Sequence, residues 1–289
     1  LGEPADAFGL TEVEACLLAT PTPLHPQQVR AAIDAGLHVL CEKPLSLDPA
    51  MSLELDGLAT RADRVLQLGF WRRYAPPWRV AKAALEADEI GAPLYIRLCQ
   101  WDADPPPASF CDPTVSGGLA IDCGVHEYDL AEWLSGHRVV RVRAYAAPMV
   151  DESLAAVGDV DNLLAILELD GGALATVDLS RNCRFGDDVR TEILGSNGAL
   201  LIDLLPVGRV RLGTASGMVD LHGVDVADVT SAGVANQAIS FAAAIRGTGP
   251  IGPGAVASAR ATLIGQAVQT SMRTGEAVDI APIGVNSTY

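Results

Sequence analysis

The chain has 289 residues, and its 20 Lys and Arg stand against 36 Asp and Glu, which gives a formal net charge of −16. Without a cluster of Lys and Arg, this balance excludes the basic surface of a protein that binds nucleic acid or an anionic membrane. Apolar residues make up 49% of the chain, which excludes a disordered acidic tail, and no apolar run reaches the roughly 20 residues of a membrane helix. We expect a soluble cytoplasmic protein with two domains.

The first seventy residues alternate short apolar runs with helical patterns. Three runs predict parallel strands buried on both faces: 13–19, 38–41 and 65–70. Helical patterns separate them, at 26–33 with Gly36 as the C-cap, and at 48–62. This alternation with short loops predicts right-handed crossovers, so we expect an α/β unit that forms part of a doubly wound parallel sheet.

After Trp71 the pattern changes to closely spaced strands with helices around them. Helices are expected near 77–87 and 118–133, and again at 235–245 and 255–273. The strand-like runs are 139–147, 162–169, 173–180, 190–194 and 199–204. Turn residues at 170–172 and 196–198 predict antiparallel hairpins. The sequence therefore predicts a partial Rossmann-type parallel sheet over 1–70, followed by a mostly antiparallel α+β domain over 71–289.

One glycine motif is expected to have no part in nucleotide binding. Residues 247–252 spell G-x-G-x-x-G and precede a helix. The segment before them has a helical pattern, whereas the nucleotide-binding motif requires a strand there. Pro250 and Pro253 also lack the backbone N–H groups that a phosphate would use. We expect a loop between two helices.

The cysteines predict neither a metal site nor a disulfide framework. All six are scattered, without a C-x-x-C pair, and three of them stand in apolar runs. Buried structural thiols in a reducing compartment explain this pattern. The first ten residues also lack the positive n-region of a signal peptide.

Lys43 stands at the carboxyl end of the second expected strand, within Cys41-Glu42-Lys43-Pro44. Ligands of open α/β sheets bind outside these ends. Lys43 would therefore place a fixed cation at the mouth of the crevice. The alternative is a solvated loop lysine that pairs with Glu42.

Asp122 and His126 are four residues apart in an expected helix, so they share one face. A carboxylate beside an imidazole can orient the ring and tune its pKa, as a general acid or base requires. Two alternatives stay open. The pair could supply two ligands to a metal ion, although no nearby residue completes a set, or His126 could be a structural histidine.

Paired arginines and aromatic residues follow the third expected strand, in Gly69-Phe70-Trp71-Arg72-Arg73-Tyr74. Trp71 and Arg72 could line a polyol pocket, because a guanidinium forms fork-like hydrogen bonds. The same residues could equally clamp a linker between two domains.

Taken together, these segments resemble the Gfo/Idh/MocA family of NAD(P)-dependent sugar and cyclitol oxidoreductases, and within it the inositol 2-dehydrogenase branch. The resemblance depends chiefly on the E-K-P signature at 42–44 and the G-G-x-x-x-D-x-x-x-H-x-x-D segment at 117–129. Further similar segments run along most of the chain: 18–25, 69–74, 181–186 and 269–276.

The resemblance implies a role for each candidate residue. His126 would be the general base, Asp122 would orient it, and Lys43 would hydrogen-bond the reacting oxygen. The implied cofactor-binding residues are Thr20, Pro21, His25, Glu42 and Lys43. The implied substrate-binding residues are Trp71, Arg72, Asp122 and His126, and no metal is implied.

The resemblance also implies ligands and assembly. The cofactor would be NAD or NADP, and the substrate a small polyol or sugar with a ring secondary alcohol. Residues 1–70 would be a dinucleotide-binding domain and 71–289 a substrate-binding and oligomerisation domain. A homo-oligomer would form through the exposed face of the antiparallel sheet.

The sequence departs from the family pattern at two places. The strand, G-x-G-x-x-G turn and ribose-binding acid with which the family begins do not precede Val13, a difference of about 60 residues at the usual size of a βαβ unit. We therefore expect this polypeptide to bind the cofactor weakly or not at all, which an NADH titration measures. The other departure is Phe185-Gly186-Asp187, where close relatives often carry tyrosines, which leaves the polyol open.

Two other functions remain open at this point. The chain could be a non-catalytic sugar-binding or assembly protein that kept the fold and lost its cofactor site. It could also be an NAD-dependent hydrolase or an epimerase-like relative. Such relatives share the Lys43 region but usually lack D-x-x-x-H, so Asp122 and His126 count against this function.

Overall fold

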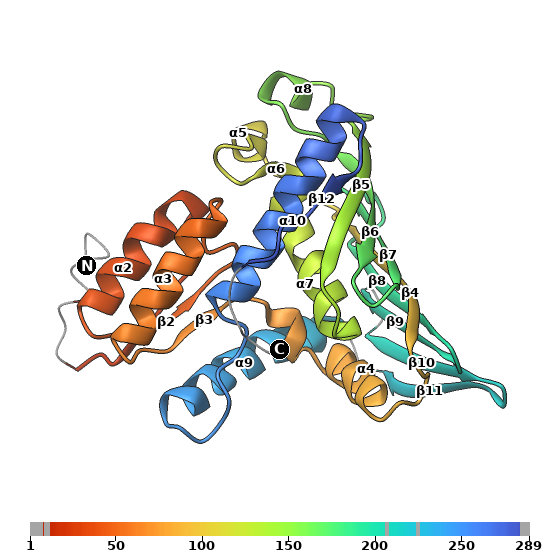
Figure 1. Cartoon of the computed structure of the whole chain (residues 1–289), viewed down its shortest axis with the longest axis horizontal. Helices are drawn as coiled ribbons and strands as arrows, with labels where there is room; N and C mark the ends of the chain where they lie inside the picture. The colour runs from red at the N-terminus through yellow and green to blue at the C-terminus, as the bar shows by residue number, and fades with distance from the viewer. Residues whose placement is uncertain (1–7, 9–11, 206–207, 224–225, 284–289) are drawn as a thin grey trace.

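Figure 1 shows the computed structural model of the chain, which describes residue 8 and residues 12–205, 208–223 and 226–283. The described residues form a three-stranded sheet and a nine-stranded sheet, with helices packed on both. The three-stranded sheet is parallel and the larger one is mostly antiparallel, as the sequence predicts.

The parallel sheet has the order β1-β2-β3, which are Ala15–Leu18, His38–Cys41 and Leu66–Leu68. The two crossover helices are α2 (His25–Asp34) and α3 (Pro49–Arg61). Asp48 caps α3 by accepting a hydrogen bond of 2.9 Å from Ala50 N. Gly36 follows α2 with φ +82°, the left-handed conformation expected of a residue that ends a helix. The predicted elements of this half are confirmed.

A helix from the other end of the chain covers the second face of this sheet. Leu40 and Val65 pack against Phe241 and Ala244 of α9 (Val226–Ile245). Figure 1 shows α2 and α3 on one side of the strands and α9 on the other. The loop after α9 then runs along the edge strand, where Leu68 N donates to Pro253 O at 2.8 Å. The G-x-G-x-x-G segment is therefore a helix–helix loop, as predicted.

The nine-stranded sheet has the order β11-β10-β9-β8-β4-β7-β6-β5-β12. The predicted hairpins β6–β7 and β8–β9 are antiparallel, whereas the central pair β4–β7 is parallel. The hairpin β10–β11 was not predicted. Its two strands are short, and their sequence has few apolar residues and several charged ones. The strands are β4 (Pro93–Trp101), β5 (Val139–Ala147), β6 (Asn162–Leu169), β7 (Leu174–Ser180), β8 (Asp188–Gly195), β9 (Ala199–Leu205), β10 (Arg209–Thr214), β11 (Gly217–Gly223) and β12 (Val278–Asp279).

The helices differ from the prediction at two places. The helix expected over 118–133 is divided into α6 (Gly118–Asp122) and α7 (Gly124–Ser135), because the chain tightens at Cys123, whose carbonyl accepts from His126 N at 3.2 Å. Helix α9 begins at Val226 rather than near residue 235. The remaining helices are α4 (Pro76–Glu86), α5 (Ala108–Cys111), α8 (Leu154–Val157) and α10 (Ala255–Thr274), with the 3-10 turns η1 (Thr22–Leu24) and η2 (Trp71–Tyr74).

Helix α10 joins the two sheets into one structure. It packs against α3 beside the parallel sheet, and against α6, α7 and β5 beside the large one. Helix α7 lies on the same inner face of the large sheet, so this face is buried. Within the described ranges, none of the helices combines the length and apolar character that a membrane crossing requires.

Candidate active site

Two motifs that are 79 residues apart in sequence meet beyond the carboxyl end of β2. Lys43 Nζ donates to the Asp122 carbonyl at 2.7 Å and lies 3.4 Å from Asp122 Oδ1. Both side chains stay accessible, at 17% and 21% of their full exposure. Because the ammonium lies at the last residue of α6, it also interacts favourably with the carbonyl end of that helix. Lys43 is therefore held in place rather than solvated or paired with Glu42.

His126 lies in the first turn of α7 and is 8% exposed. Its ring packs edge-to-face with the ring of Phe70, with 6.3 Å between the two centroids. Its Nδ1 is buried and has no hydrogen-bond partner among the described residues. Burial and the positive charges of Lys43 and Arg72 lower the pKa of His126 well below its ordinary value. The ring is therefore neutral near pH 7 and able to accept a proton.

A buried arginine that the sequence analysis did not single out holds Asp122 from the other side. Arg181 follows β7 and is 1% exposed. Its guanidinium donates to Asp159 Oδ2 at 3.1 Å and lies 3.5 Å from Asp122 Oδ2. The two oxygens of Asp122 thus face different cations, Lys43 and Arg181. The only sequence signal for Arg181 is its place in the segment 181–186.

Arg72 is buried in an ion pair rather than directed at open space. Its guanidinium donates to Glu127, which is fully buried, and to Gln100 Oε1 at 2.7 Å. Trp71 is half-buried and packs against Trp78, with ring centroids 6.4 Å apart. The polyol-binding roles of Arg72 and Trp71 remain predictions. The contacts of Arg72 give it an electrostatic effect on the neighbouring His126.

The residues expected at the cofactor lie in the loops after β1 and β2. Thr20 Oγ1 donates to Gln28 Oε1 at 2.5 Å, and the Pro21 carbonyl accepts from Leu24 N at 2.9 Å. His25 is buried, with Nε2 2.7 Å from the Thr20 carbonyl and Nδ1 2.9 Å from the carbonyl of the residue after Lys43. His25 therefore links the loops after β1 and β2, and any effect of His25 on a cofactor would act through the backbone of these loops.

Glu42 lies at the edge of the sheet, beside the end of β3. A Cβ atom on Gly69 would lie 2.7 Å from a Glu42 carboxylate oxygen, so a larger residue at this position would require the carboxylate to move. Glu42 is half-buried and could accept hydrogen bonds from ribose hydroxyls. The expected place of Glu42, Thr20 and Lys43 at the nicotinamide end of a dinucleotide remains a prediction. None of the three described parallel strands is followed by a glycine-rich turn, and we assign no residue to the phosphates.

The chemistry of the site is that of a buried neutral base close to a partly exposed cation. His126 can accept a proton, and Lys43 can stabilise a developing alkoxide. Proton transfer assisted by a fixed positive charge is chemistry that these two residues support. The described side chains include no group of three or more His, Cys, Asp or Glu that could hold a metal ion.

Comparison with known proteins gives the same family over most of the chain. The profile of an oxidoreductase family with an NAD-binding Rossmann fold matches residues 3–70, and that of the Gfo/Idh/MocA C-terminal domain matches 78–201. The scyllo-inositol 2-dehydrogenase (NAD(+)) of Bacillus subtilis is 33% identical over 205 residues, which are 71% of this chain and 59% of that relative. The chain thus spans less than two thirds of the curated relatives that it matches best.

Two solved structures have the same fold. The myo-inositol 2-dehydrogenase of Lactobacillus plantarum superposes with a TM-score of 0.83 at 28% identity, over 97% of this chain and 84% of that one. The scyllo-inositol dehydrogenase of Lactobacillus casei, solved with NAD(H) and scyllo-inositol, gives 0.80 at 26% identity, over 96% and 83%. The fold, the E-K-P and D-x-x-x-H residues and these matches agree, and the chain belongs to the Gfo/Idh/MocA family.

Proposed function

We propose that the protein is an NAD(P)-dependent dehydrogenase that oxidises a ring secondary alcohol of a cyclitol or sugar. The observation that carries this proposal is the meeting of Lys43 and Asp122 one turn before His126. A cation and a carboxylate close to a neutral imidazole are what removal of a hydroxyl proton requires. The names of the inositol dehydrogenases that the chain resembles support the same substrate class.

Each residue then has a defined task. The neutral ring of His126 accepts the proton of the substrate hydroxyl, and Lys43 donates a hydrogen bond to the oxygen as negative charge develops on it. Asp122, held between Lys43 and Arg181, accepts a hydrogen bond from a neighbouring hydroxyl of the ring and fixes its orientation. Bound NAD or NADP would supply the hydride acceptor, with Thr20, Glu42 and Lys43 at its nicotinamide end.

Inositol is our proposal for the ring, because the relatives named above act on inositols. The segment Phe185-Gly186-Asp187 lies where the family resemblance implies tyrosines, and Phe185 is an exposed side chain. A missing phenolic hydroxyl at this place would change which isomer binds best. The assay must therefore include several inositols together with aldoses.

The test is a spectrophotometric assay of the full gene product with NAD⁺ and NADP⁺ against this panel. We expect reduction of the cofactor with at least one inositol or aldose. His126→Ala should lower kcat by about 10²- to 10⁴-fold, the usual contribution of a positioned acid or base, with little change in cofactor affinity. His137→Ala, which removes a half-exposed histidine paired with Asp170, should leave kcat unchanged. An unaltered rate in His126→Ala, or no turnover of any cyclitol or sugar, would refute the proposal.

We further propose a cytoplasmic homo-oligomer. All six cysteines are free, as is usual in a reducing compartment. Apolar side chains are exposed on the outer face of the large sheet, among them Tyr145, Leu164 and Ile166. A second copy of the chain would cover them.

A further inference from the structure

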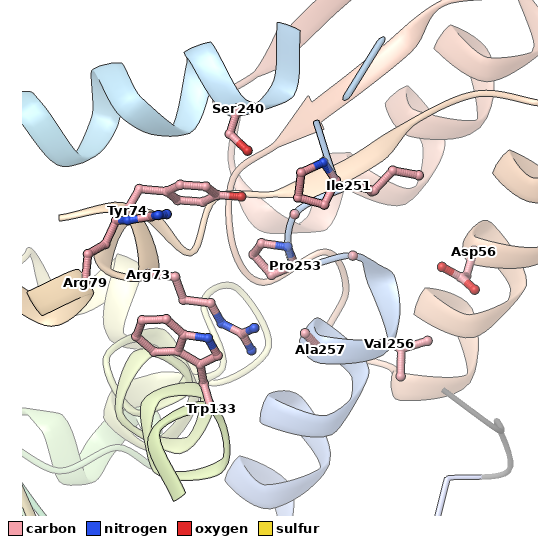
Figure 2. A pocket seen from close by; sticks show the side chains of 13 residues that line it. Asp56, Arg73, Tyr74, Arg79, Trp133, Ser240, Ile251, Pro253, Val256 and Ala257 are labelled. Atoms are coloured by element: carbon pink, nitrogen blue, oxygen red, sulfur yellow. The ribbon is translucent and has the colours of Figure 1, made fainter. Parts of the chain in front are cut away.

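A cavity of about 540 Å³ lies apart from the residues assigned above to the reaction, and Figure 2 shows it from close by. Its walls come from α3, η2, α4, α7, α9 and the start of α10, and none of Lys43, Asp122 and His126 lines it. Its volume lies within the usual range of roughly 300–1,000 Å³ for small-molecule sites. The proposed dehydrogenase reaction leaves this cavity without a role.

One end of the cavity is positively charged. Arg79 of α4 is exposed there, and its side chain has no hydrogen-bond or ion-pair partner among the described residues. Arg73 of η2 also lines it and lies 5.6 Å from the centre of the Trp133 ring, with Asp129 as a bidentate partner at 2.6 and 2.8 Å. A guanidinium at the wall of a cavity favours a carboxylate or phosphate ligand.

A buried hydroxyl lies at the same end. Tyr74 is only 6% exposed, and its phenolic oxygen makes no well-formed hydrogen bond within the described ranges, although the Ser240 hydroxyl is near it. Burial raises the pKa of Tyr74, so the hydroxyl keeps its proton and can donate it in a hydrogen bond. The phenolic oxygen is fully enclosed and lies against Gly252 and the Ser240 hydroxyl, so Tyr74 closes this end of the cavity, and the guanidinium of Arg79 is the group that faces a ligand there.

The rest of the wall restricts the ligand further. Asp56 of α3 lies across the cavity from the arginines, as Figure 2 shows, and would repel a second negative charge. It can instead accept a hydrogen bond from a hydroxyl or ammonium group. Between the two ends the wall is apolar and aromatic, with Trp133, Ile251 and Val256.

The adjacent arginines of η2 therefore belong to different sites. Arg72 is directed at Glu127 beside His126, whereas Arg73 lines the cavity. We propose that this cavity binds a small organic monoanion with an apolar or aromatic body and a hydroxyl or ammonium group. Its anionic group contacts Arg79, its body packs on Trp133, and its donor group faces Asp56.

The test is isothermal titration calorimetry without cofactor, using 3-(4-hydroxyphenyl)propanoate as the probe, because its carboxylate and its hydroxyl lie at opposite ends of an aromatic body. Its neutral control is 3-(4-hydroxyphenyl)propan-1-ol, in which a CH₂OH group replaces the carboxylate. We expect the carboxylate probe to bind with a Kd in the millimolar range or tighter, and the alcohol at least about tenfold more weakly. Equal affinities, or no heat of binding from the carboxylate probe, would overturn the proposal.

Variants assign the binding to this cavity. Arg79→Ala and Asp56→Ala should each weaken binding of the carboxylate probe by about three- to tenfold, as expected for a lost hydrogen bond to a charged group. Arg273→Ala, which removes an exposed arginine at the far end of α10, is the matched control and should leave the Kd unchanged. Binding that survives both Arg79→Ala and Asp56→Ala would place the ligand elsewhere and refute the assignment. Because no turnover is measured, failure here is distinguishable from failure of the dehydrogenase assay.

Discussion

The electrostatic environment of His126 disfavours its protonated form. Desolvation is the largest cause of the lowered pKa of His126, and the positive charges of Lys43 and Arg72 lower it further. In the unfolded chain the same imidazole is solvated and binds a proton near pH 6.5, the ordinary value. The folded protein therefore binds fewer protons than the unfolded chain as the pH falls through this value.

The free energy of unfolding should consequently depend on pH through His126. The contribution of this residue is fully present above pH 6.5 and is lost as the pH falls below it, at up to about 1.4 kcal/mol per pH unit until the lower folded pKa is reached. Urea unfolding of the chain and of His126→Gln at several pH values between 7 and 5 measures it. We expect the curve of His126→Gln to be flatter.

The control for this prediction is His137→Gln, because His137 is half-exposed just beyond the other end of α7 and pairs with Asp170. This variant loses a histidine outside the site, so the difference between the curves of the two variants isolates the contribution of His126. A curve of His126→Gln parallel to that of the unmodified chain would show that His126 titrates alike in the folded and unfolded states. The assignment of a buried neutral base would then be wrong.

Residue patterns predicted part of this site and missed the rest. Lys43, Asp122 and His126 stand in short motifs, so spacing and position at a strand end identify them. Arg181 and Glu127 act through tertiary contacts with residues 59 and 55 positions away, for which no local pattern exists. A sequence also does not show that Glu127 and Gln100 accept hydrogen bonds from Arg72, whose substrate-binding role stays a prediction.

At the scale of elements, the loop between α9 and α10 shows how a sequence motif can mislead. Its Gly252 is required by packing rather than by a phosphate. A Cβ atom there would lie 1.9 Å from the Tyr74 phenolic oxygen and 2.8 Å from the Gln67 side chain, both of which are buried. The loop is also bonded to the edge strand β3 through Pro253. Any displacement of Gly252 therefore disturbs the end of the parallel sheet.

Gly252→Ala should lower the free energy of unfolding by about 1–3 kcal/mol, the usual cost of inserting a methyl group into a packed site. Gly254→Ala in the same loop is the control, because its added Cβ would make only ordinary contacts, the nearest at 3.6 Å. Thermal or urea unfolding of both variants measures the difference. Equal stability of the two would show that the Tyr74 and Gln67 side chains move aside without cost.

At the scale of the whole molecule, strand and helix periodicity predicted the two-sheet architecture, but not how its parts join. Antiparallel hairpins depend on local turns, so β6–β7 and β8–β9 could be predicted. The parallel pair β4–β7 and the contact of α10 with α3 connect residues far apart in sequence. These long-range contacts form when apolar faces are buried during folding, and no local sequence pattern specifies which strand or helix will be the partner.

The outer face of the large sheet is a feature of the whole molecule, and it has a testable consequence. Tyr145 of β5 is directly opposite Leu164 of β6, and Ile166 lies two residues further along β6. These three exposed apolar side chains, with Tyr145 at 57% exposure and the Arg143 guanidinium over its ring, are called the patch below. Exposed apolar side chains that gather on one face commonly mark association surfaces, and a symmetric self-association would bury the patch of each copy.

We therefore expect a homo-oligomer at micromolar concentration, and dissociation when charge enters the patch. The double substitution Tyr145→Asp and Leu164→Asp places two carboxylates opposite each other on each copy. Burying these charges in an interface costs much more free energy than keeping them solvated in the monomer. Light scattering coupled to size-exclusion chromatography gives the mass of each species. Ile239→Asp, which changes an equally exposed residue of α9, should keep the assembly intact. A monomeric parent chain, or an assembly that survives the double substitution, would show that the sheet face is not the interface.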